Sequence, residues 1–81
     1  MKYILKVYSA SWCGECRTVK KLMDDNGIEY EVVDIDKQPD EFTANNVDGM
    51  PTVIAYKNGK EDGRWDVTKG SILSWVKFLE V

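Results

Sequence analysis

Two cysteines are the residues of this chain most able to do covalent chemistry, and they are its only thiols. Cys13 and Cys16 are separated by two residues in the stretch YSASWCGECRTVKKL, between a run typical of a strand and a run typical of a helix. Thiols with this spacing can form a stabilising disulfide, hold a metal ion or carry out redox chemistry. Each possibility requires something different from the rest of the chain.

The first two possibilities fit the sequence poorly. A disulfide across so short a loop removes only about 2 kcal/mol of unfolded-chain entropy, against about 4–5 kcal/mol for a loop spanning a domain. A structural zinc ion takes four ligands, usually Cys and His, and the chain has no histidine and no third cysteine. Two chains could still pool their cysteine pairs, so a metal site between copies remains an alternative.

Redox chemistry fits the position of the pair. A sulfur at a helix N-terminus meets unpaired backbone N–H groups and the positive end of the helix dipole, which favour the thiolate. We expect Cys13 to lie there, exposed, and Cys16 to be buried on the same helix face as Val19 and Met23. An exposed thiolate can attack a disulfide, and its shielded neighbour can resolve the mixed disulfide. A Cys-x-x-Cys pair beside a strand–helix–strand pattern is typical of a redox motif.

Strands and helices that would position the pair can be predicted along the chain. Runs of apolar and β-branched residues predict strands over residues 2–8, 30–35, 51–56 and 64–67. Asn58-Gly59 is a strong hairpin signal between the last two strands.

Helices are predicted from apolar residues at helical spacing. The first helix follows Cys13, ends at Asn26-Gly27 and has an apolar face of Cys16, Val19, Leu22 and Met23. A short helix is predicted within 36–46, where a proline suits the first turn. The last helix is predicted over 68–79, with Thr68 as its N-cap and an apolar stripe of Ile72, Leu73, Trp75, Val76 and Leu79.

These elements follow the order βαβαββα in a single domain, residues 1–81. A right-handed strand–helix–strand crossover makes the first two strands parallel neighbours, and the hairpin makes the last two strands antiparallel. The sequence therefore predicts an α/β fold with a four-stranded mixed β-sheet flanked by three helices.

Composition narrows the classes of partner. The chain is 43% hydrophobic and 31% charged, with a net charge of -3, which argues against nucleic acid or an anionic membrane as the main partner. No apolar run approaches the ~20 residues of a membrane span, and MKYILKVY lacks the cleavage site of a signal peptide. We expect a monomer in the cytoplasm, where thiols are kept reduced.

Several stretches resemble those of the thioredoxin superfamily. Residues 12–16, WCGEC, are similar to its active site, in which Trp-Cys-Gly-Pro-Cys is usual. Further segments that resemble the family are DIDKQP (34–39), GMPT (49–52), YKNGK (56–60) and TKGSILSWVKFL (68–79). In length the chain is similar to a glutaredoxin, which is the minimal version of the same fold.

The resemblance implies a thioredoxin-like fold and a dithiol–disulfide oxidoreductase that reduces protein disulfides. Cys13 would be the nucleophile and Cys16 the resolving thiol, Trp12 would pack beside the site, the backbone of Met50 would pair with a substrate strand, and Pro51 would follow a cis peptide bond. From the residues alone, Trp12 could equally be a core aromatic. Pro51 would by itself be predicted to follow a trans bond, because few X-Pro bonds in folded proteins are cis.

The resemblance also implies partners. These are disulfide-containing client proteins, with ribonucleotide reductase as one client by family analogy, and an electron donor similar to thioredoxin reductase. The Cys13–Cys16 disulfide would be the redox group, so neither a cofactor nor a metal is implied. A glutaredoxin that uses glutathione is the alternative within the same superfamily.

The chain departs from the family pattern at several positions. Glu15 stands where the family usually has proline, and Val7 and Val32 stand where thioredoxins usually have a buried Asp and its Lys partner. Losing both charges together is reasonable, because one alone would be an unpaired buried charge, but it leaves the proton acceptor for Cys16 unassigned. Trp65-Asp66 lies near the loop before the last helix, which is usually small in thioredoxins, so the substrate preference of that family is not carried over to this chain. The Cys-Pro-Tyr-Cys motif and the Gly-Gly-x-Asp stretch usual in glutaredoxins are both absent, so the sequence does not support a glutathione site.

Overall fold

The predicted order of helices and strands is confirmed in the computed structural model, which describes residues 3–79. Its elements are β1 (Ile4–Ser9), α1 (Gly14–Asp25), β2 (Glu31–Asp34), α2 (Pro39–Ala44), β3 (Thr52–Lys57), β4 (Lys60–Asp66), a 3-10 turn (Val67–Lys69) and α3 (Ile72–Leu79). Residue 2, which we predicted in the first strand, lies outside the described residues. Among residues 3–79, none of the helices is long and apolar enough to cross a membrane.

The four strands form one mixed sheet in the order β2-β1-β3-β4, as predicted. β1 runs parallel to β2 and antiparallel to β3, and β3 runs antiparallel to β4. The two central strands carry most of the buried residues because both of their faces are covered. The two edge strands are more polar, which is usual where one side of a strand meets water.

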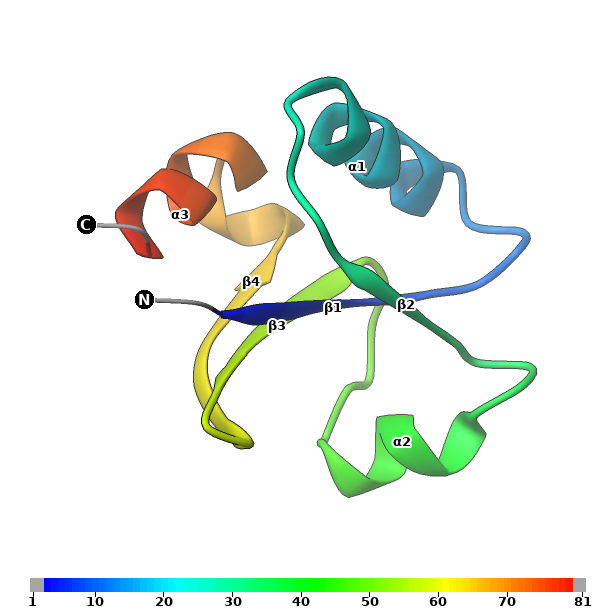
Figure 1. Ribbon diagram of the computed structural model, residues 1–81. Coiled ribbons are helices and arrows are strands. Elements are labelled where there is room, and N and C mark those ends of the chain that lie inside the picture. Colours follow the sequence, from blue (N-terminus) through cyan, green and yellow to red (C-terminus); the bar gives the residue numbers. More distant parts are fainter. Residues whose placement is uncertain (1–2, 80–81) are drawn as a thin grey trace.

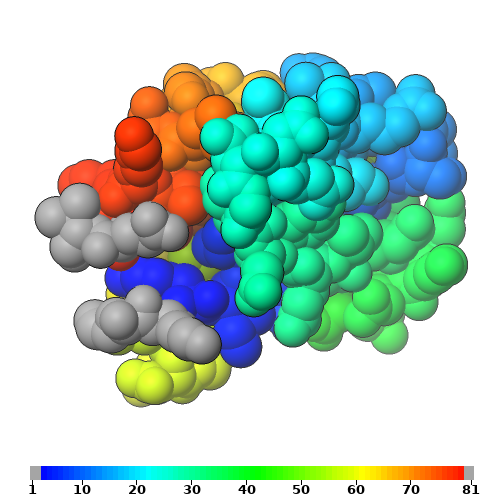
Figure 2. Space-filling model, turned by 45° about the horizontal axis from the view of Figure 1, so that its top comes forward, coloured from blue at the N-terminus to red at the C-terminus, as the bar shows by residue number. Residues whose placement is uncertain are grey.

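Two helices cover one face of the sheet and one helix covers the other (Figure 1). α1 and α3 lie side by side on the first face, as Figure 2 also shows. The core beneath them consists of Leu5, Val7, Val19, Met23, Val53, Ala55, Trp65, Ile72 and Val76. The core beneath α2 consists of Tyr8, Val33, Phe42, Val47 and Ile54. Successive side chains of a strand point to opposite faces, so β1 supplies both cores.

Two Asn-Gly pairs lie where the sequence predicted a helix end and a hairpin turn. Asn26 is the C-cap of α1, and Gly27 follows with a φ of 68°. The Ile28 N–H donates to the Met23 carbonyl (2.9 Å), which closes the helix end in a Schellman motif. Asn58 and Gly59 both have positive φ, 55° and 79°, as a two-residue type I′ hairpin turn requires.

The last helix begins later than predicted. Thr68 is not its N-cap, because residues 67–69 form a 3-10 turn and Gly70 breaks the chain direction with a φ of 83°. Asp66 caps that turn by accepting the Thr68 N–H (2.9 Å). α3 then begins after Ser71, whose Oγ accepts the Ser74 N–H (3.3 Å) in the usual N-cap arrangement.

Two smaller predictions also need correction. β4 starts at Lys60 rather than at residue 64, because its polar first half is an edge segment that pairs with β3 despite lacking apolar residues. Leu22 lies at the exposed border of α1 rather than in the core, where Cys16, Val19 and Met23 form the buried face. The predicted stripe of α3 is confirmed, with Ile72 and Val76 buried.

Gly63 offers a test of how β4 packs against α3. A Cβ at this position would lie 3.5 Å from Cζ2 of Trp75 and 3.6 Å from Cδ2 of Leu79, both ordinary contact distances. Its φ is not in the left-handed region, so Gly63→Ala should raise the free energy of unfolding by about 0.4–1 kcal/mol through reduced freedom of the unfolded chain. Urea denaturation measures the change.

Gly27→Ala is the matched control for this substitution. It also replaces glycine by alanine. The added Cβ at Gly27 would have no atom within 4 Å, but the φ of 68° is strained for any residue with a Cβ. We expect Gly27→Ala to lower the free energy of unfolding by about 1–2 kcal/mol. A loss of stability in Gly63→Ala would mean that α3 packs against β4 more tightly than these distances indicate.

Candidate active site

The two cysteines form a disulfide at the point where β1 leads into α1. Cys13 and Cys16 are bonded to each other, with their Cα atoms 5.3 Å apart. The turn before them is closed by the Cys13 N–H, which donates to the Ala10 carbonyl (3.1 Å). The pair thus lies at the carboxyl end of a central strand, and the position predicted from the sequence is confirmed.

The sulfur of Cys13 occupies the N-cap of α1. Cys13 has extended backbone angles (φ -90°, ψ 107°), and its Sγ accepts the Cys16 N–H at 3.1 Å. N–H groups in the first turn of a helix have no partner within the helix. This geometry supplies the hydrogen bond and the positive dipole end that favour a thiolate on Cys13 once the disulfide is reduced. Glu15, in the same first turn, is exposed.

Cys13 is less exposed than we predicted. Only 8% of its surface is accessible, whereas Cys16 is fully buried as expected. The reason is that the bonded pair packs together with Ala10 in a small cluster, against which Ile35 and Met50 also pack. The order of accessibility that the redox interpretation needs, Cys13 above Cys16, is nevertheless present.

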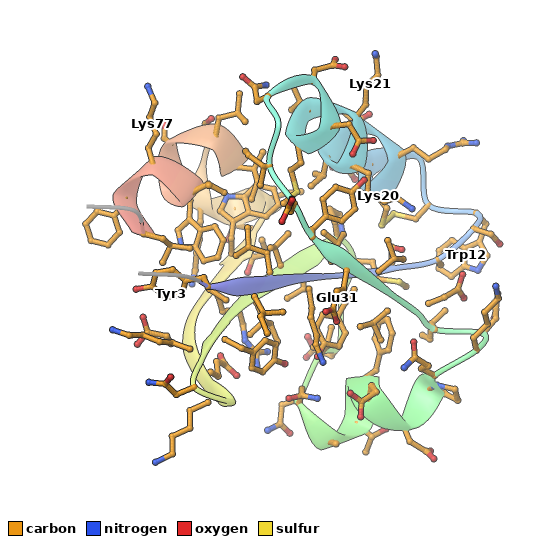
Figure 3. The ribbon with its side chains drawn as sticks, in the orientation of Figure 1. Tyr3, Trp12, Lys20, Lys21, Glu31 and Lys77 are labelled. Carbon is orange, nitrogen blue, oxygen red and sulfur yellow. A yellow bond between two sulfur atoms is a disulfide. The ribbon has the colours of Figure 1, made fainter. Side chains whose placement is uncertain are left out.

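The predicted substrate-binding residues lie in different environments. Trp12 is 68% exposed in the turn between β1 and α1 (Figure 3), which excludes the alternative that it is a core aromatic. Met50 is half-buried and packs against the cysteine cluster. The Met50-Pro51 peptide bond is cis, as the resemblance implied, and Pro51 is fully buried.

The site also includes residues that sequence reasoning did not single out. Ile35 follows β2, and its N–H donates to the Ser9 carbonyl (3.0 Å) at the end of β1. This bond brings Ile35 against the cysteine cluster. The position of Ile35 could have been predicted from the sequence, because the carboxyl ends of parallel neighbouring strands meet at one end of the sheet.

Val7 and Val32 are paired in the register of β1 and β2, but only one of them is buried. Val7 is fully buried, whereas 46% of Val32 is exposed on the edge strand. The expectation that a charge at either position would be buried is therefore wrong for position 32, because an edge-strand side chain there reaches water. The expectation is correct for position 7, because Val7 is fully buried.

Trp65 and Asp66 have structural roles. Trp65 is buried in the core under α1 and α3, and its Nε1 donates to the Gly70 carbonyl (3.1 Å). The pKa of Asp66 is lowered because its carboxylate accepts hydrogen bonds from the hydroxyl and the backbone N–H of Thr68. Trp65 is therefore a core residue, and Asp66 caps the 3-10 turn that follows β4. Within residues 3–79, no three Cys, Asp or Glu side chains are grouped so that they could hold a metal ion.

The chain is similar in sequence to glutaredoxins and thioredoxins. The glutaredoxin family model matches residues 5–54. Thioredoxin H2 of Arabidopsis thaliana is 38% identical over 65 residues, which are 74% of this chain and 49% of that protein. Thioredoxin of Gallus gallus is 37% identical over 65 residues, covering 74% of this chain and 62% of that protein. The chain spans about half the length, or less, of the first curated relatives it matches.

Solved structures agree with this result. The reduced thioredoxin pre-protein of Schistosoma mansoni superposes with a TM-score of 0.77 and 29% identity, over 94% of this chain and 77% of that one. The segment that the family model matches is more than half of the chain and includes both cysteines and Pro51. Since model, relatives and fold agree, this chain belongs to the thioredoxin superfamily.

Proposed function

We propose that the chain is a small dithiol–disulfide oxidoreductase that reduces the disulfides of client proteins. The observation that carries this proposal is the Cys13–Cys16 disulfide, with the Cys13 sulfur accepting an N–H bond at the start of α1. The exposed Trp12, next to Cys13 in the chain, and the half-buried Met50, which packs against the cysteine cluster, would form the surface that meets a client. The similarity to thioredoxins supports the same assignment.

The reaction consists of two thiol–disulfide exchanges. The Cys13 thiolate attacks one sulfur of the client disulfide, which forms a mixed disulfide and releases the other client sulfur as a thiolate. Cys16, after losing its proton, attacks the Cys13 sulfur, forms the Cys13–Cys16 disulfide and releases the second client thiolate. Two electrons pass from the protein to the client, and protons from solvent complete the two client thiols. An external dithiol of a reductase then restores the pair.

Clients, electron donor and location follow from the resemblance to the superfamily. The electron donor would be an enzyme similar to thioredoxin reductase, and ribonucleotide reductase is one proposed client. The proposed location is the cytoplasm, where the reduced state of the pair is maintained. Glutathione is the less favoured donor, because the chain lacks the Cys-Pro-Tyr-Cys and Gly-Gly-x-Asp patterns.

Insulin reduction in three parallel reactions tests the proposal. With dithiothreitol as the reductant, the protein should accelerate insulin precipitation well above the uncatalysed rate. With NADPH and thioredoxin reductase, NADPH oxidation should depend on the protein; with NADPH, glutathione and glutathione reductase, it should not. No acceleration with dithiothreitol would show that the chain is not a disulfide reductase, and turnover with glutathione alone would make it a glutaredoxin in function.

The metal-binding alternative requires a separate control. Metal analysis and size-exclusion chromatography of the reduced protein should give a metal-free monomer under the same conditions as the insulin assay. A dimer with one zinc ion per two chains, together with no insulin reduction, would favour the shared Cys-x-x-Cys site over the oxidoreductase.

A further inference from the structure

The loop 45–51 connects α2 to β3 and contains Met50, whose backbone would pair with a client. Its far end is held by the Thr52 hydroxyl, which donates to the Gly49 carbonyl (2.8 Å). Its near end begins at Asn45, the C-cap of α2, and continues through Asn46 with a φ of 55°. The position of Met50 against the cysteine cluster therefore depends on how both ends of this loop are fixed.

Arg64 of β4 holds the near end of the loop from a distant part of the sequence. Its Nη2 donates to the Asn45 carbonyl (2.7 Å), and its Nη1 donates to the Asn46 carbonyl (3.1 Å). The carbonyl of Asn45, the C-cap, is one of the last carbonyls of α2, which have no partner within the helix and form the negative end of its dipole, and the carbonyl of Asn46 lies just beyond the helix. A guanidinium satisfies two acceptors at once with a fixed planar geometry, which a lysine ammonium does not provide.

Glu61 keeps the guanidinium in this orientation. Its Oε2 accepts the Arg64 Nε–H (3.0 Å), and its Oε1 accepts the Arg64 Nη2–H (2.8 Å). The pKa of Glu61 is lowered by these hydrogen bonds from Arg64. The Arg64 side chain is 26% exposed and the Glu61 side chain is 39% exposed, so the pair is a partly shielded surface ion pair.

Asn45 is held from a second side by the sheet. The Tyr56 hydroxyl donates to Asn45 Oδ1 (3.0 Å), and the hydroxyl of the fully buried Tyr8 lies 2.7 Å from the Tyr56 oxygen. The Asn45 Nδ2 in turn donates to the Glu41 carbonyl (2.9 Å) of α2. The near end of the loop is thus tied to β1, β3 and β4 together, and Arg64 with its partner Glu61 supplies the charged groups of this network.

We infer that Arg64 is a positioning residue for client binding: through Asn45 and Asn46 it fixes the loop that presents the Met50 backbone beside the disulfide. This inference rests on the proposed function. The Arg64 side chain donates its hydrogen bonds to Asn45, Asn46 and Glu61, whereas the two sulfurs lie in the separate cysteine cluster. Its loss should therefore weaken the pairing of a protein client with the loop and leave the chemistry at Cys13 intact.

Steady-state kinetics of Arg64→Met with two substrates test the inference. With insulin as the client, KM should rise about 3- to 10-fold and kcat should change by less than about 2-fold, because a loosened loop costs binding. With 5,5′-dithiobis(2-nitrobenzoate), a small disulfide that needs no strand pairing, the rate of the reduced protein should stay within about 2-fold. Arg64→Lys should give an intermediate KM, because lysine keeps the positive charge but lacks the planar guanidinium that donates to two carbonyls at once.

Lys21→Met is the matched control variant. It also replaces a cation by methionine and removes an ion pair, Lys21–Asp25 (3.2 Å), but on the outer face of α1, where Lys21 points away from the sheet (Figure 3). Its kinetics should equal those of the unmodified protein. If Arg64→Met proves unstable, Glu61→Gln keeps the guanidinium and should raise the insulin KM by a smaller factor.

Two results would overturn the positioning role. One is an unchanged insulin KM in a folded Arg64→Met protein, and the other is an equal loss of rate with the small disulfide, which would mean that Arg64 acts on the thiols or on the fold. Failure of the proposed function is recognised separately, because the unmodified protein would then not reduce insulin at all.

Discussion

Cys13→Ser should reduce insulin only at the uncatalysed rate, whereas Cys16→Ser should become trapped in mixed disulfides with its clients. The physical reason is the unequal position of the two sulfurs. Cys16 is fully buried, while the Cys13 sulfur retains some exposure and lies at the N-terminus of α1. Only Cys13 can therefore begin the exchange with a client, and only Cys16 is placed to attack the sulfur of Cys13 afterwards.

Mass spectrometry of the two variants measures this division of roles. Reduced Cys16→Ser should release one nitrothiobenzoate per chain from 5,5′-dithiobis(2-nitrobenzoate) and keep the second bound, whereas Cys13→Ser should react much more slowly. Unfolding Cys13→Ser in urea provides the control, because it should restore fast reaction of Cys16. Catalytic insulin reduction by Cys16→Ser at the rate of the unmodified protein would rule out the two-cysteine mechanism.

Val7→Asp should lower the free energy of unfolding by about 3–5 kcal/mol at neutral pH, as expected for an unpaired buried charge. Val7 is fully buried in the core with Val19, Met23 and Val53. A loss of this size is a large part of the total stability of a domain of this length, about 4–12 kcal/mol. Urea denaturation followed by tryptophan fluorescence gives the value.

The destabilisation in Val7→Asp should depend on pH in a defined direction. Burial raises the pKa of the introduced carboxyl in the folded state above its unfolded value of about 3.9. The folded state therefore binds its proton more readily, so the cost of the substitution is full above the folded pKa and decreases as the pH falls through it. Measurements at pH 7 and pH 4 should show the smaller loss at pH 4.

Two further variants separate charge from shape and position. Val7→Asn has a similar side-chain shape without a charge, and its cost should not change between pH 7 and pH 4. Val32→Asp places the same carboxylate at the neighbouring register position, where the side chain is half-exposed, and should cost less than about 1 kcal/mol. An equal loss at positions 7 and 32 would mean that strand preference, rather than burial, dominates at both.

Local features of this protein could be predicted because their causes lie within a few residues of one another. Asn58-Gly59 reverses the chain since both residues adopt positive φ, and Asn26-Gly27 ends α1 for a related reason. The spacing of Cys13 and Cys16 at the start of a helix likewise determined their pairing and the order of their accessibility. The alternation of strands and helices then limited the topology to the mixed sheet that is observed.

Other features were decided by contacts between residues far apart in the sequence. Packing with Ile35 and Met50 makes Cys13 more buried than its position at the helix start alone would. Trp65, which the sequence placed near a loop, is buried in the core. Arg64 reaches carbonyls 18 and 19 residues before it, a separation that no local pattern reveals. Sequence by itself therefore determined the position of the two sulfurs and the order of the elements, because backbone preference and periodicity act locally. The tertiary structure decided how exposed those sulfurs are and what holds the loop beside them, because burial and long-range hydrogen bonds exist only once the sheet has brought distant segments together.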